Sequence, residues 1–242
     1  LEHRAGILAS DAGWSAATWA ELADLGLLAL DIDEADGGIG AGPVGTMLVS
    51  QATGAGLLLE PFLSSAVIAT RVVSFLARGT QREKLLGALA SGEAIAVGVL
   101  HAPSARWLLV TAHTSDGIGV FMVDRQAEGV QLDAWRSVDG QHAADIELDV
   151  LLDDDARLGS GDARDALDEA LDRGLAALCA DALGVLDRIL AATVQYTRDR
   201  VQFGTPIGRL QALQHRMADM YMQVEQARSM MYLATSACLQ SD

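Results

Sequence analysis

The sequence predicts an α+β fold that is mainly α, with two helical domains on either side of a β-sheet or small barrel. Two observations predict it: apolar residues recur every three or four positions in the first and last thirds of the chain, and they alternate with polar residues in between. We therefore expect a helical N-terminal domain over 1–93, a β domain over 94–155 and a helical-bundle domain over 162–242, with a linker within 156–166.

The N-terminal region has the apolar spacing of several short helices. Trp19, Leu22 and Leu25 recur at intervals of three, and Gly26 then interrupts the pattern. We expect further helices over 46–58, after Pro61, and as two short segments within 71–93. The stretch GAGPVG (40–45) has the glycine spacing of a dinucleotide-binding turn, but DEADGGI separates it from the apolar segment upstream. We therefore interpret it as a glycine-rich loop between helices.

The middle region changes to the period of β-strands. RWLLVTAH (106–113), the turn signal SDG (115–117) and IGVFMVD (118–124) predict a β-hairpin. In ADIELDVLL (144–152), Ile146, Leu148 and Val150 are expected on the buried face and the intervening acidic residues on the solvated face. One solvated face is typical of an antiparallel sheet or a small barrel.

The C-terminal region predicts two long amphipathic helices. One apolar stripe precedes residue 200 and another follows it: Leu167, Leu171, Leu175, Leu178, Ala182, Val185 and Ile189, then Leu210, Leu213, Met217, Met220, Val224, Ala227 and Met231. A hairpin of two helices cannot bury both stripes. We therefore expect further helices, either from polypeptide beyond Asp242, which would make 162–242 only the first half of its domain, or from a partner.

Composition excludes several classes of function. A formal charge of −16 argues against binding to nucleic acid, which requires clustered Lys and Arg. No apolar run is long enough to span a bilayer, and no secretory leader opens the sequence. Cys179 and Cys238 lie in apolar helical patterns and are expected to be buried and reduced, as in a cytoplasmic protein. The five histidines are scattered, so we expect no metal site.

The segment RDRVQFGTPIGRLQALQH (198–215) carries more chemistry than a connection between two helices needs. A helix–helix turn explains Gly204, which would end the first helix, and Pro206, which would begin the second. It does not explain Arg200, Gln202, Phe203 and Gln211. These offer a guanidinium for phosphate, amides for hydrogen bonds and a ring for stacking, close to a helix N-terminus. The pattern favours contact with the diphosphate part of a nucleotide.

The same segment resembles the acyl-CoA dehydrogenase family. The likeness runs from about 183 to 237 and includes the patterns YxxxRxQFGxPI (196–207), QxxQHxxADM (211–220) and ExAR (225–228). LADLGLLALDIDEADGGIGAGP (22–43) is similar to the N-terminal segment of the family, and the helix–sheet–helix order matches its three-domain layout. EPFLSS (60–65) and HAPSARWLLV (101–110) are most similar to the small-subunit type of heteromeric bacterial members, such as the pimeloyl-CoA dehydrogenase small subunit.

The resemblance implies an FAD-dependent enzyme that converts an acyl-CoA thioester to its trans-2-enoyl-CoA and passes electrons to electron-transferring flavoprotein. It implies a dimer of dimers, built from one or two kinds of chain, in which Arg200, Gln202, Phe203 and Gln211 contact the ADP part of FAD held mainly by the neighbouring subunit. It also assigns Asp172 to the substrate site.

The sequence departs from the family pattern in the β domain and on the first long helix. The flavin-contacting stretch TEPGxGSD and a later WI[ST]N segment are absent, so the β domain is expected to lack residues near 98–101. The position on the first long helix where some members carry the catalytic glutamate corresponds to Gly174, so no catalytic base is assigned. Three readings remain open: a dehydrogenase subunit, a non-catalytic partner subunit that shares FAD, and a helical scaffold without flavin.

Overall fold

The computed structural model describes residues 2–240, and the chain divides into two compact units. The first unit comprises Leu1–Thr46 and Leu59–Gly174, and the second comprises Met47–Leu58 and Leu175–Asp242. Two helices, α3 (Gly42–Gly56) and α6 (Arg164–Asp199), pass from one set of residues to the other. Within residues 2–240, no helix combines the length and the apolar character that crossing a bilayer requires.

The helices of the first unit form where the sequence predicts them. Besides parts of α3 and α6, the unit contains the helices α1 (Glu2–Leu8), α2 (Ala16–Asp24), a π-helix (Phe62–Ala69), α4 (Thr70–Leu76) and α5 (Gly79–Ala90). The hydroxyl of Ser15 accepts a hydrogen bond from the backbone of Thr18 and caps α2 at its start. Gly26 follows α2 with φ of 74°, a left-handed conformation that suits glycine, which confirms the predicted end of this helix.

The glycine-rich stretch is a loop only as far as Ala41, because residues 42–45 form the first turn of α3, which corrects the expectation of a loop over 40–45. A 3-10 helix (Glu34–Asp36) precedes it instead of a strand, so the strand that a dinucleotide-binding turn requires is missing. Gly38 packs closely against the backbone of Ile32, where a Cβ atom would lie 2.1 Å from the carbonyl oxygen. Helix α3 starts at Gly42 with φ of 57°, four residues before the predicted start.

The sheet of the first unit is mixed rather than antiparallel. Its strand order is β1-β2-β3-β6, formed by β1 (Ala96–Val97), β2 (Trp107–Thr114), β3 (Gly117–Asp124) and β6 (Arg157–Leu158). β2 and β3 form the predicted hairpin, whereas β1 pairs with β2 in parallel. β4 (Val130–Arg136) and β5 (His142–Leu148) make a separate antiparallel ribbon, so the described strands form two sheets in this unit and no barrel.

The ribbon also corrects the expected burial of the alternating segment. β5 ends at Leu148, and Leu148 and Leu151 are both exposed to solvent. The paired residues Asp133 and Asp145 lie directly opposite each other, on the same face of the ribbon. The alternation therefore predicted the strand correctly but overestimated its length and the burial of its last apolar residues.

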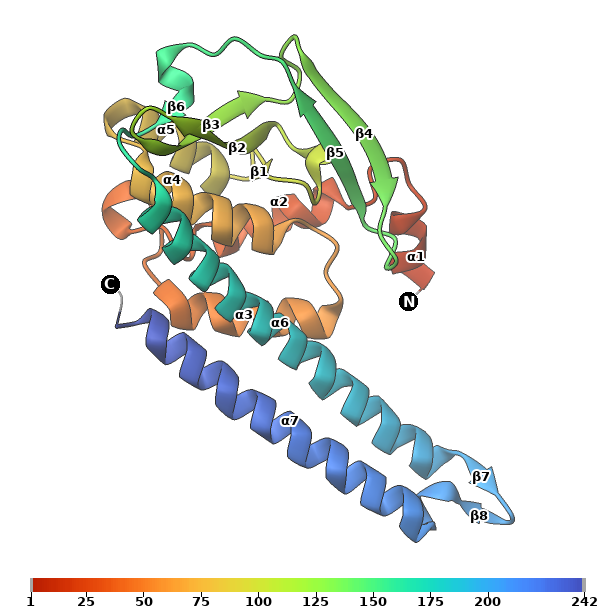
Figure 1. Cartoon of the computed structure of the whole chain (residues 1–242). Coiled ribbons are helices and arrows are strands. Elements are labelled where there is room, and N and C mark those ends of the chain that lie inside the picture. The colour runs from red at the N-terminus through yellow and green to blue at the C-terminus, as the bar shows by residue number, and fades with distance from the viewer. Residues whose placement is uncertain (1, 241–242) are drawn as a thin grey trace. The chain divides into compact units, whose positions relative to one another are not determined.

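The core of the first unit lies between the sheet and the helices. Val72 and Val73 of α4 and Leu86 of α5 pack with Val120 of β3 and Leu158 of β6. Figure 1 shows this sheet alongside α4 and α5. All five side chains are at most 3% exposed, so this contact is the main source of hydrophobic stabilisation for the unit.

The π-helix is held in its widened form by buried hydrogen bonds. Both the backbone N–H and the hydroxyl of Thr70 donate to the carbonyl oxygen of Ser65, the hydroxyl over 3.0 Å. The Ser65 hydroxyl in turn accepts a hydrogen bond from the backbone N–H of Ala96 in β1, over 3.2 Å. A π turn carries one more residue than an α turn, and such turns are frequent at functional sites.

The second unit is built on the antiparallel pair of α6 and α7 (Gln211–Cys238), with residues 47–58 packed against it. Figure 1 shows α7 running back along α6 after the short hairpin that joins them. Met47, Ala180, Leu183, Val224 and Met231 form its core. The second predicted stripe is confirmed, because Val224 and Met231 are buried and all its other members except the exposed Leu210 are half-buried.

Most of the first predicted stripe faces solvent instead, although Leu167 and Val185 are half-buried. Leu171, Leu175, Leu178 and Ile189 are all exposed, and Cys179 beside them is exposed as well, which corrects the expectation that both cysteines are buried. The buried face of α6 is made of small residues, chiefly Ala170, Ala177, Ala180 and Gly184, together with Leu183. The spacing of the leucines predicted the helix correctly but misplaced the face on which it packs.

Small residues allow α3 and α6 to approach backbone to backbone within the second unit. A Cβ atom on Gly54 would lie 1.9 Å from the carbonyl oxygen of Asp181, and one on Gly184 would lie 2.0 Å from that of Gln51. Polar contacts surround the crossing: Gln51 Nε2 donates to Asp187 Oδ2 over 3.0 Å, and Arg188 donates to the carbonyl oxygen of Ala55. No other amino acid fits at either glycine without separating the helices.

Gly54→Ala and Gly184→Ala should each lower the free energy of unfolding by about 3 kcal/mol, because the added methyl group overlaps backbone of the facing helix. Gly56→Ala is the matched control. Gly56 also lies in α3 but has open space around it, so alanine should raise stability by about 0.5–1 kcal/mol. Urea denaturation of the three variants measures this, and equal effects at positions 54 and 56 would contradict the close crossing.

An ion pair joins α5 to the loop before α3. Arg82 donates from Nε to both oxygens of Asp36, over 3.0 and 3.1 Å, and its Nη2 also contacts Oδ2. Hydrogen bonding from Arg82 lowers the pKa of Asp36 below its ordinary value of 3.8. Because the folded-state pKa is lowered, this pair stabilises the fold fully above pH 4, and the contribution disappears as the pH falls through the folded-state pKa.

Arg82→Gln should therefore destabilise the protein by about 1 kcal/mol at pH 7, and the difference from the parent should shrink below pH 4. Arg78→Gln is the control, because Arg78 donates to the carbonyl oxygens of Phe75 and Ala77 and not to a carboxylate. Unfolding free energies measured from pH 7 to pH 3 test this. A difference between parent and Arg82→Gln that does not depend on pH would refute the assigned role of the pair.

Candidate functional site

The connection between α6 and α7 is a β-hairpin rather than the predicted helix–helix turn. α6 ends at Asp199, and β7 (Val201–Gln202) pairs with β8 (Thr205–Pro206) before a 3-10 helix (Ile207–Arg209) leads into α7. Gly204 therefore forms the tip of the hairpin and does not end α6. The backbone of Ile207 donates to the carbonyl oxygen of Arg200 over 2.9 Å and extends the pairing by one step.

The tip of the hairpin presents an aromatic ring to solvent. Phe203 and Gly204 both have positive φ, 53° and 76°, as a two-residue type I′ turn requires. This conformation is uncommon for a bulky residue and is tolerated here at the tip. Phe203 is 95% exposed and Val201 beside it is 54% exposed, so the sequence places apolar surface where no residue of the described chain covers it.

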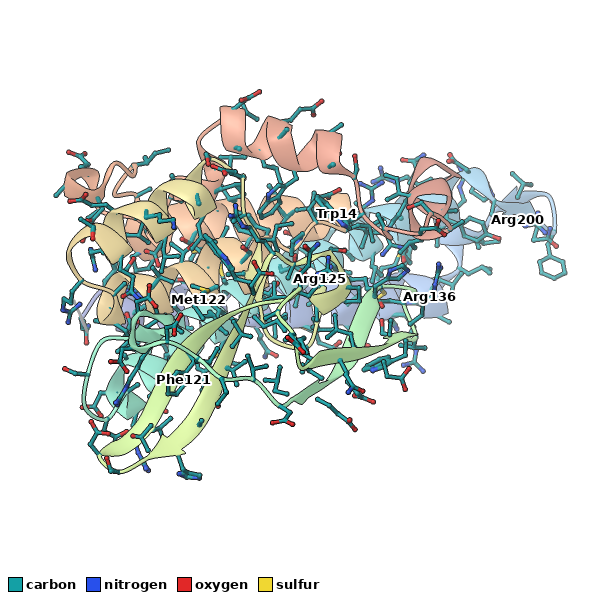
Figure 2. The ribbon with its side chains drawn as sticks, turned by 90° about the horizontal axis from the view of Figure 1, so that it is seen from above. Trp14, Phe121, Met122, Arg125, Arg136 and Arg200 are labelled. Carbon is teal, nitrogen blue, oxygen red and sulfur yellow. The ribbon has the colours of Figure 1, made fainter. Side chains whose placement is uncertain are left out.

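Three of the predicted polar residues lie on or beside this hairpin with their side chains in solvent. Arg200 immediately precedes β7, and its guanidinium has no partner among residues 2–240 (Figure 2). Gln202 donates only to the carbonyl oxygen of Val201, the residue before it. Gln211 is exposed at the first position of α7. With Phe203, the structure thus gathers the four predicted cofactor residues on one short segment of the second unit.

The N-terminus of α7 is uncapped. Leu210 occupies the N-cap position and offers no side-chain acceptor. The N–H of Leu213 donates to the carbonyl oxygen of Leu210, which leaves the N–H groups of Gln211 and Ala212 without an acceptor among residues 2–240. The helix dipole adds partial positive charge at the same end. Together with the guanidinium of Arg200, these donors fit a diphosphate, and the ring of Phe203 fits a flat heterocycle. The residues present are therefore compatible with a dinucleotide cofactor.

The base of the hairpin is packed tightly against α6. A Cβ atom on Gly208 would lie 3.0 Å from the carbonyl oxygen of Thr197. Thr197 is buried, and its hydroxyl donates to the carbonyl oxygen of Val194 over 2.8 Å and lies 3.3 Å from the sulfur of Met217 in α7. This packing explains why position 208 carries a glycine. It also holds the hairpin in one position relative to α6 and α7.

The first unit contains an apolar cavity of about 350 Å³. Its walls come from the π-helix and α4, from β1 to β3 and the segment after β1, and from α6. Its main apolar members are Ile68, Val72, Val97, Leu109, Val120 and Leu167. Sequence reasoning did not identify this cavity, because its lining residues read as ordinary core positions until the fold brings them together.

The two other predicted positions lie near the start of α6. Asp172 is exposed on α6 in the first unit, whereas the four cofactor residues belong to the second. Gly174 is buried, and a Cβ atom there would lie 2.6 Å from Cγ1 of Ile68. A glutamate at position 174 would have to displace Ile68 from the cavity wall. The absence of a catalytic base at this position is therefore built into the packing.

A buried ion network fixes the first half of α6. Arg173, only 4% exposed, donates from Nε to Glu169 Oε1 over 3.1 Å and has Nη1 3.7 Å from Asp31 Oδ1. Glu169 also receives Nε of Arg71 at both oxygens, over 2.9 and 3.0 Å, and Arg71 stacks on the ring of Phe75. The network joins α6 to α4 and to the loop after α2.

Arg173→Met should lower the free energy of unfolding by about 3 kcal/mol, because it removes the buried cation that faces the buried carboxylate of Asp31 and the half-buried one of Glu169. Arg164→Met, on the same helix, should change it by less than about 0.5 kcal/mol, since that side chain is 65% exposed and its ion pair spans 3.8 Å. Chemical denaturation compares the two, and similar effects would show that the buried network is not a stability determinant.

The described residues contain no group of three or more His, Cys, Asp or Glu side chains arranged to hold a metal ion. The second unit offers donors for an anion and a ring for stacking, and the first unit offers an apolar cavity.

Comparison with known proteins identifies the family of the chain. Residues 3–93 match the family model for the acyl-CoA dehydrogenase N-terminal domain, and residues 164–242 match the model for the acyl-CoA dehydrogenase C-terminal domain. Acyl-CoA dehydrogenase IpdE2 from Mycobacterium tuberculosis is 32% identical over 225 residues, which are 92% of this chain and 66% of that protein. The chain thus spans just under two thirds of the length of this relative.

Solved structures agree with the family models. The ChsE4–ChsE5 complex from Mycobacterium tuberculosis matches with a TM-score of 0.88 at 26% identity, over 99% of this chain and 72% of the matched one. The FAD complex of PigA matches with a TM-score of 0.88 over 100% of this chain and 75% of the other, at 20% identity, a level that supports the fold alone. On the family models, the sequence relative and the fold, this chain belongs to the acyl-CoA dehydrogenase family.

Proposed function

We propose that this chain is a subunit of an FAD-dependent acyl-CoA dehydrogenase that converts an acyl-CoA thioester to the trans-2-enoyl-CoA. The observation that carries the proposal is the hairpin between α6 and α7, where exposed Arg200, Gln202 and Phe203 stand beside the uncapped helix N-terminus at Gln211. Membership of the family supports it, and the FAD in the PigA complex shows that this fold accommodates the cofactor in a relative.

The hairpin would bind the ADP part of FAD held mainly by a neighbouring subunit. Arg200 and the first N–H groups of α7 would hold the diphosphate, Gln202 and Gln211 would donate to polar atoms, and Phe203 would stack on the adenine or pack at the interface. When bound, FAD supplies the acceptor for the hydride that leaves the β-carbon of the substrate. The exposure of all four side chains suits a cofactor that lies between two chains.

The acyl group of the thioester substrate is proposed to bind in the first unit. Its cavity would exclude water from the acyl group, which matters because the α-proton becomes acidic enough to remove only in a dry, hydrogen-bonded site. Asp172, exposed on α6, is proposed to contact the substrate near its CoA part. The domain limits 1–93, 94–155 and 162–242, with residues lacking near 98–101, remain part of this proposal.

A second function is favoured by one observation. The position on α6 that carries the glutamate in some family members is Gly174 here, and Ile68 would have to move to admit a longer side chain. The base must then come from residues outside this sequence or from another subunit. In the latter case the chain is a non-catalytic partner that shares FAD within a heteromeric acyl-CoA dehydrogenase, an arrangement compatible with its similarity to the ChsE4–ChsE5 complex.

The proposed partners follow from either function. We expect a homo- or hetero-oligomer of the dimer-of-dimers type, an acyl-CoA substrate, electron-transferring flavoprotein as the electron acceptor and a cytoplasmic location. The exposed leucines of α6 and the exposed Phe203 are surfaces that such an assembly would cover.

Flavin content and flavin reduction separate these possibilities. The purified chain is examined for flavin absorbance, then mixed with acyl-CoA under anaerobic conditions, alone and after co-expression with a partner subunit. Bleaching by the chain alone identifies a self-sufficient dehydrogenase, and bleaching only with the partner identifies the FAD-sharing subunit. Protein that stays colourless and takes up no added FAD in both preparations rules out the proposed function and leaves a helical scaffold.

Arg200→Ala should weaken the binding of FAD by about tenfold or more, because a charge-assisted hydrogen bond to phosphate is worth about 1.5–3 kcal/mol. Helix content should not change, since this guanidinium has no partner among residues 2–240. Arg216→Ala is the control: it removes the same charge from an exposed position of α7, five residues after Gln211. Flavin occupancy measured by absorbance tests the role, and equal occupancy in both variants would argue against it.

A further inference from the structure

We propose that the apolar cavity of the first unit selects uncharged acyl groups and rejects acyl groups that end in a carboxylate. This inference rests on the proposed function and names the class of substrate for it. It is carried by the chemistry of the lining: among the described residues that form the cavity, none is ionisable, and the only side-chain polar atoms are the hydroxyls of Ser64 and Thr111.

Ser64, the π-helix residue whose hydroxyl lines the cavity, has a backbone acceptor for that hydroxyl. Ser64 donates to the carbonyl oxygen of Pro61 over 3.4 Å, within its own turn. The neighbouring Ser65 and Thr70 are buried, and their hydroxyls bond to backbone groups that maintain the π-helix. This wall therefore presents Ile68 to the cavity, with no hydroxyl proton in reserve for a carboxylate.

Two arginines on helix turns next to the cavity, Arg71 and Arg173, are already paired with carboxylates. Arg71 precedes the lining residue Val72 on α4, and its Nε donates to both oxygens of Glu169. Arg173 on α6 donates to the same carboxylate and faces Asp31. Redirecting either arginine toward the cavity would break the buried network, so neither is a ready counter-ion for a bound anion.

These contacts decide the selectivity. A carboxylate loses its hydration on entering an apolar cavity, and without a counter-ion or several donors the loss is not recovered. A hydrocarbon chain of the same length gains stabilisation from the same walls. The remaining hydroxyl, on Thr111, lies at an exposed position of β2 and is a single neutral donor, which is too little to offset the penalty.

The test compares hexanoyl-CoA with adipoyl-CoA, two thioesters with six acyl carbons that differ at the distal end in a methyl group against a carboxylate. Dissociation constants are measured by titrating the flavin-loaded protein, in complex with its partner subunit if flavin is retained only there. We expect adipoyl-CoA to bind at least about tenfold more weakly. Equal affinity, or tighter binding of adipoyl-CoA, overturns the selectivity but leaves the proposed function intact. Failure of both thioesters to bind overturns both.

A matched pair of variants locates the discrimination. Thr111→Arg places a cation at the cavity, whereas Ala112→Arg places the same charge one residue further along β2, on the opposite face of the strand and outside the lining. Both positions are exposed, so both variants should fold, which circular dichroism checks. Thr111→Arg should reduce the preference for hexanoyl-CoA by about tenfold, and Ala112→Arg should leave it unchanged. A preference that is equal in both variants would mean that selectivity arises elsewhere, and the proposal would be wrong.

Discussion

The buried guanidinium of Arg173 fixes the helix on which both functional features of this chain depend. It pairs with Glu169 and faces Asp31, and Glu169 in turn holds Arg71, so the first half of α6 is tied to α4 and to the loop after α2. Charges buried to this degree are stable only as a complete set, which restricts how α6 can rotate or slide. The same helix supplies Leu167 to the apolar cavity and ends at Asp199, where the hairpin begins.

Packing, rather than charge, sets the position of the other half of α6. Gly54 and Gly184 let α3 and α6 approach so closely that any side chain at either position would meet backbone. This arrangement uses the Ala- and Gly-rich face of α6 and leaves Leu171, Leu175 and Leu178 in solvent. A face of large apolar residues that the chain itself does not cover is what a subunit of an assembly would present.

The chemistry is divided between two kinds of surface. The hairpin offers solvated donors and an exposed ring, which suit an anionic cofactor shared between chains. The cavity offers mainly apolar walls, which suit the hydrocarbon part of a thioester. Ile68 connects the second of these with the missing catalytic base, because it lines the cavity and fills the space beside Gly174. A longer side chain at position 174 would therefore change the wall of the cavity as well as the surface of α6.

The sequence by itself determined which regions are helical and which are β, and it located the β2–β3 hairpin and the apolar stripe of α7. It also indicated the family, through the patterns that begin at Tyr196. These features depend on local periodicity and on residues close together in the chain, which a pattern records directly. Only the tertiary structure decided that Gly204 forms a hairpin tip and that Leu171, Leu175 and Leu178 of α6 are exposed. It also decided that Ile68 lies against Gly174 and that scattered apolar residues line one cavity. Each of these depends on contacts between residues far apart in sequence, and periodicity along one helix does not reveal which face its neighbours will cover.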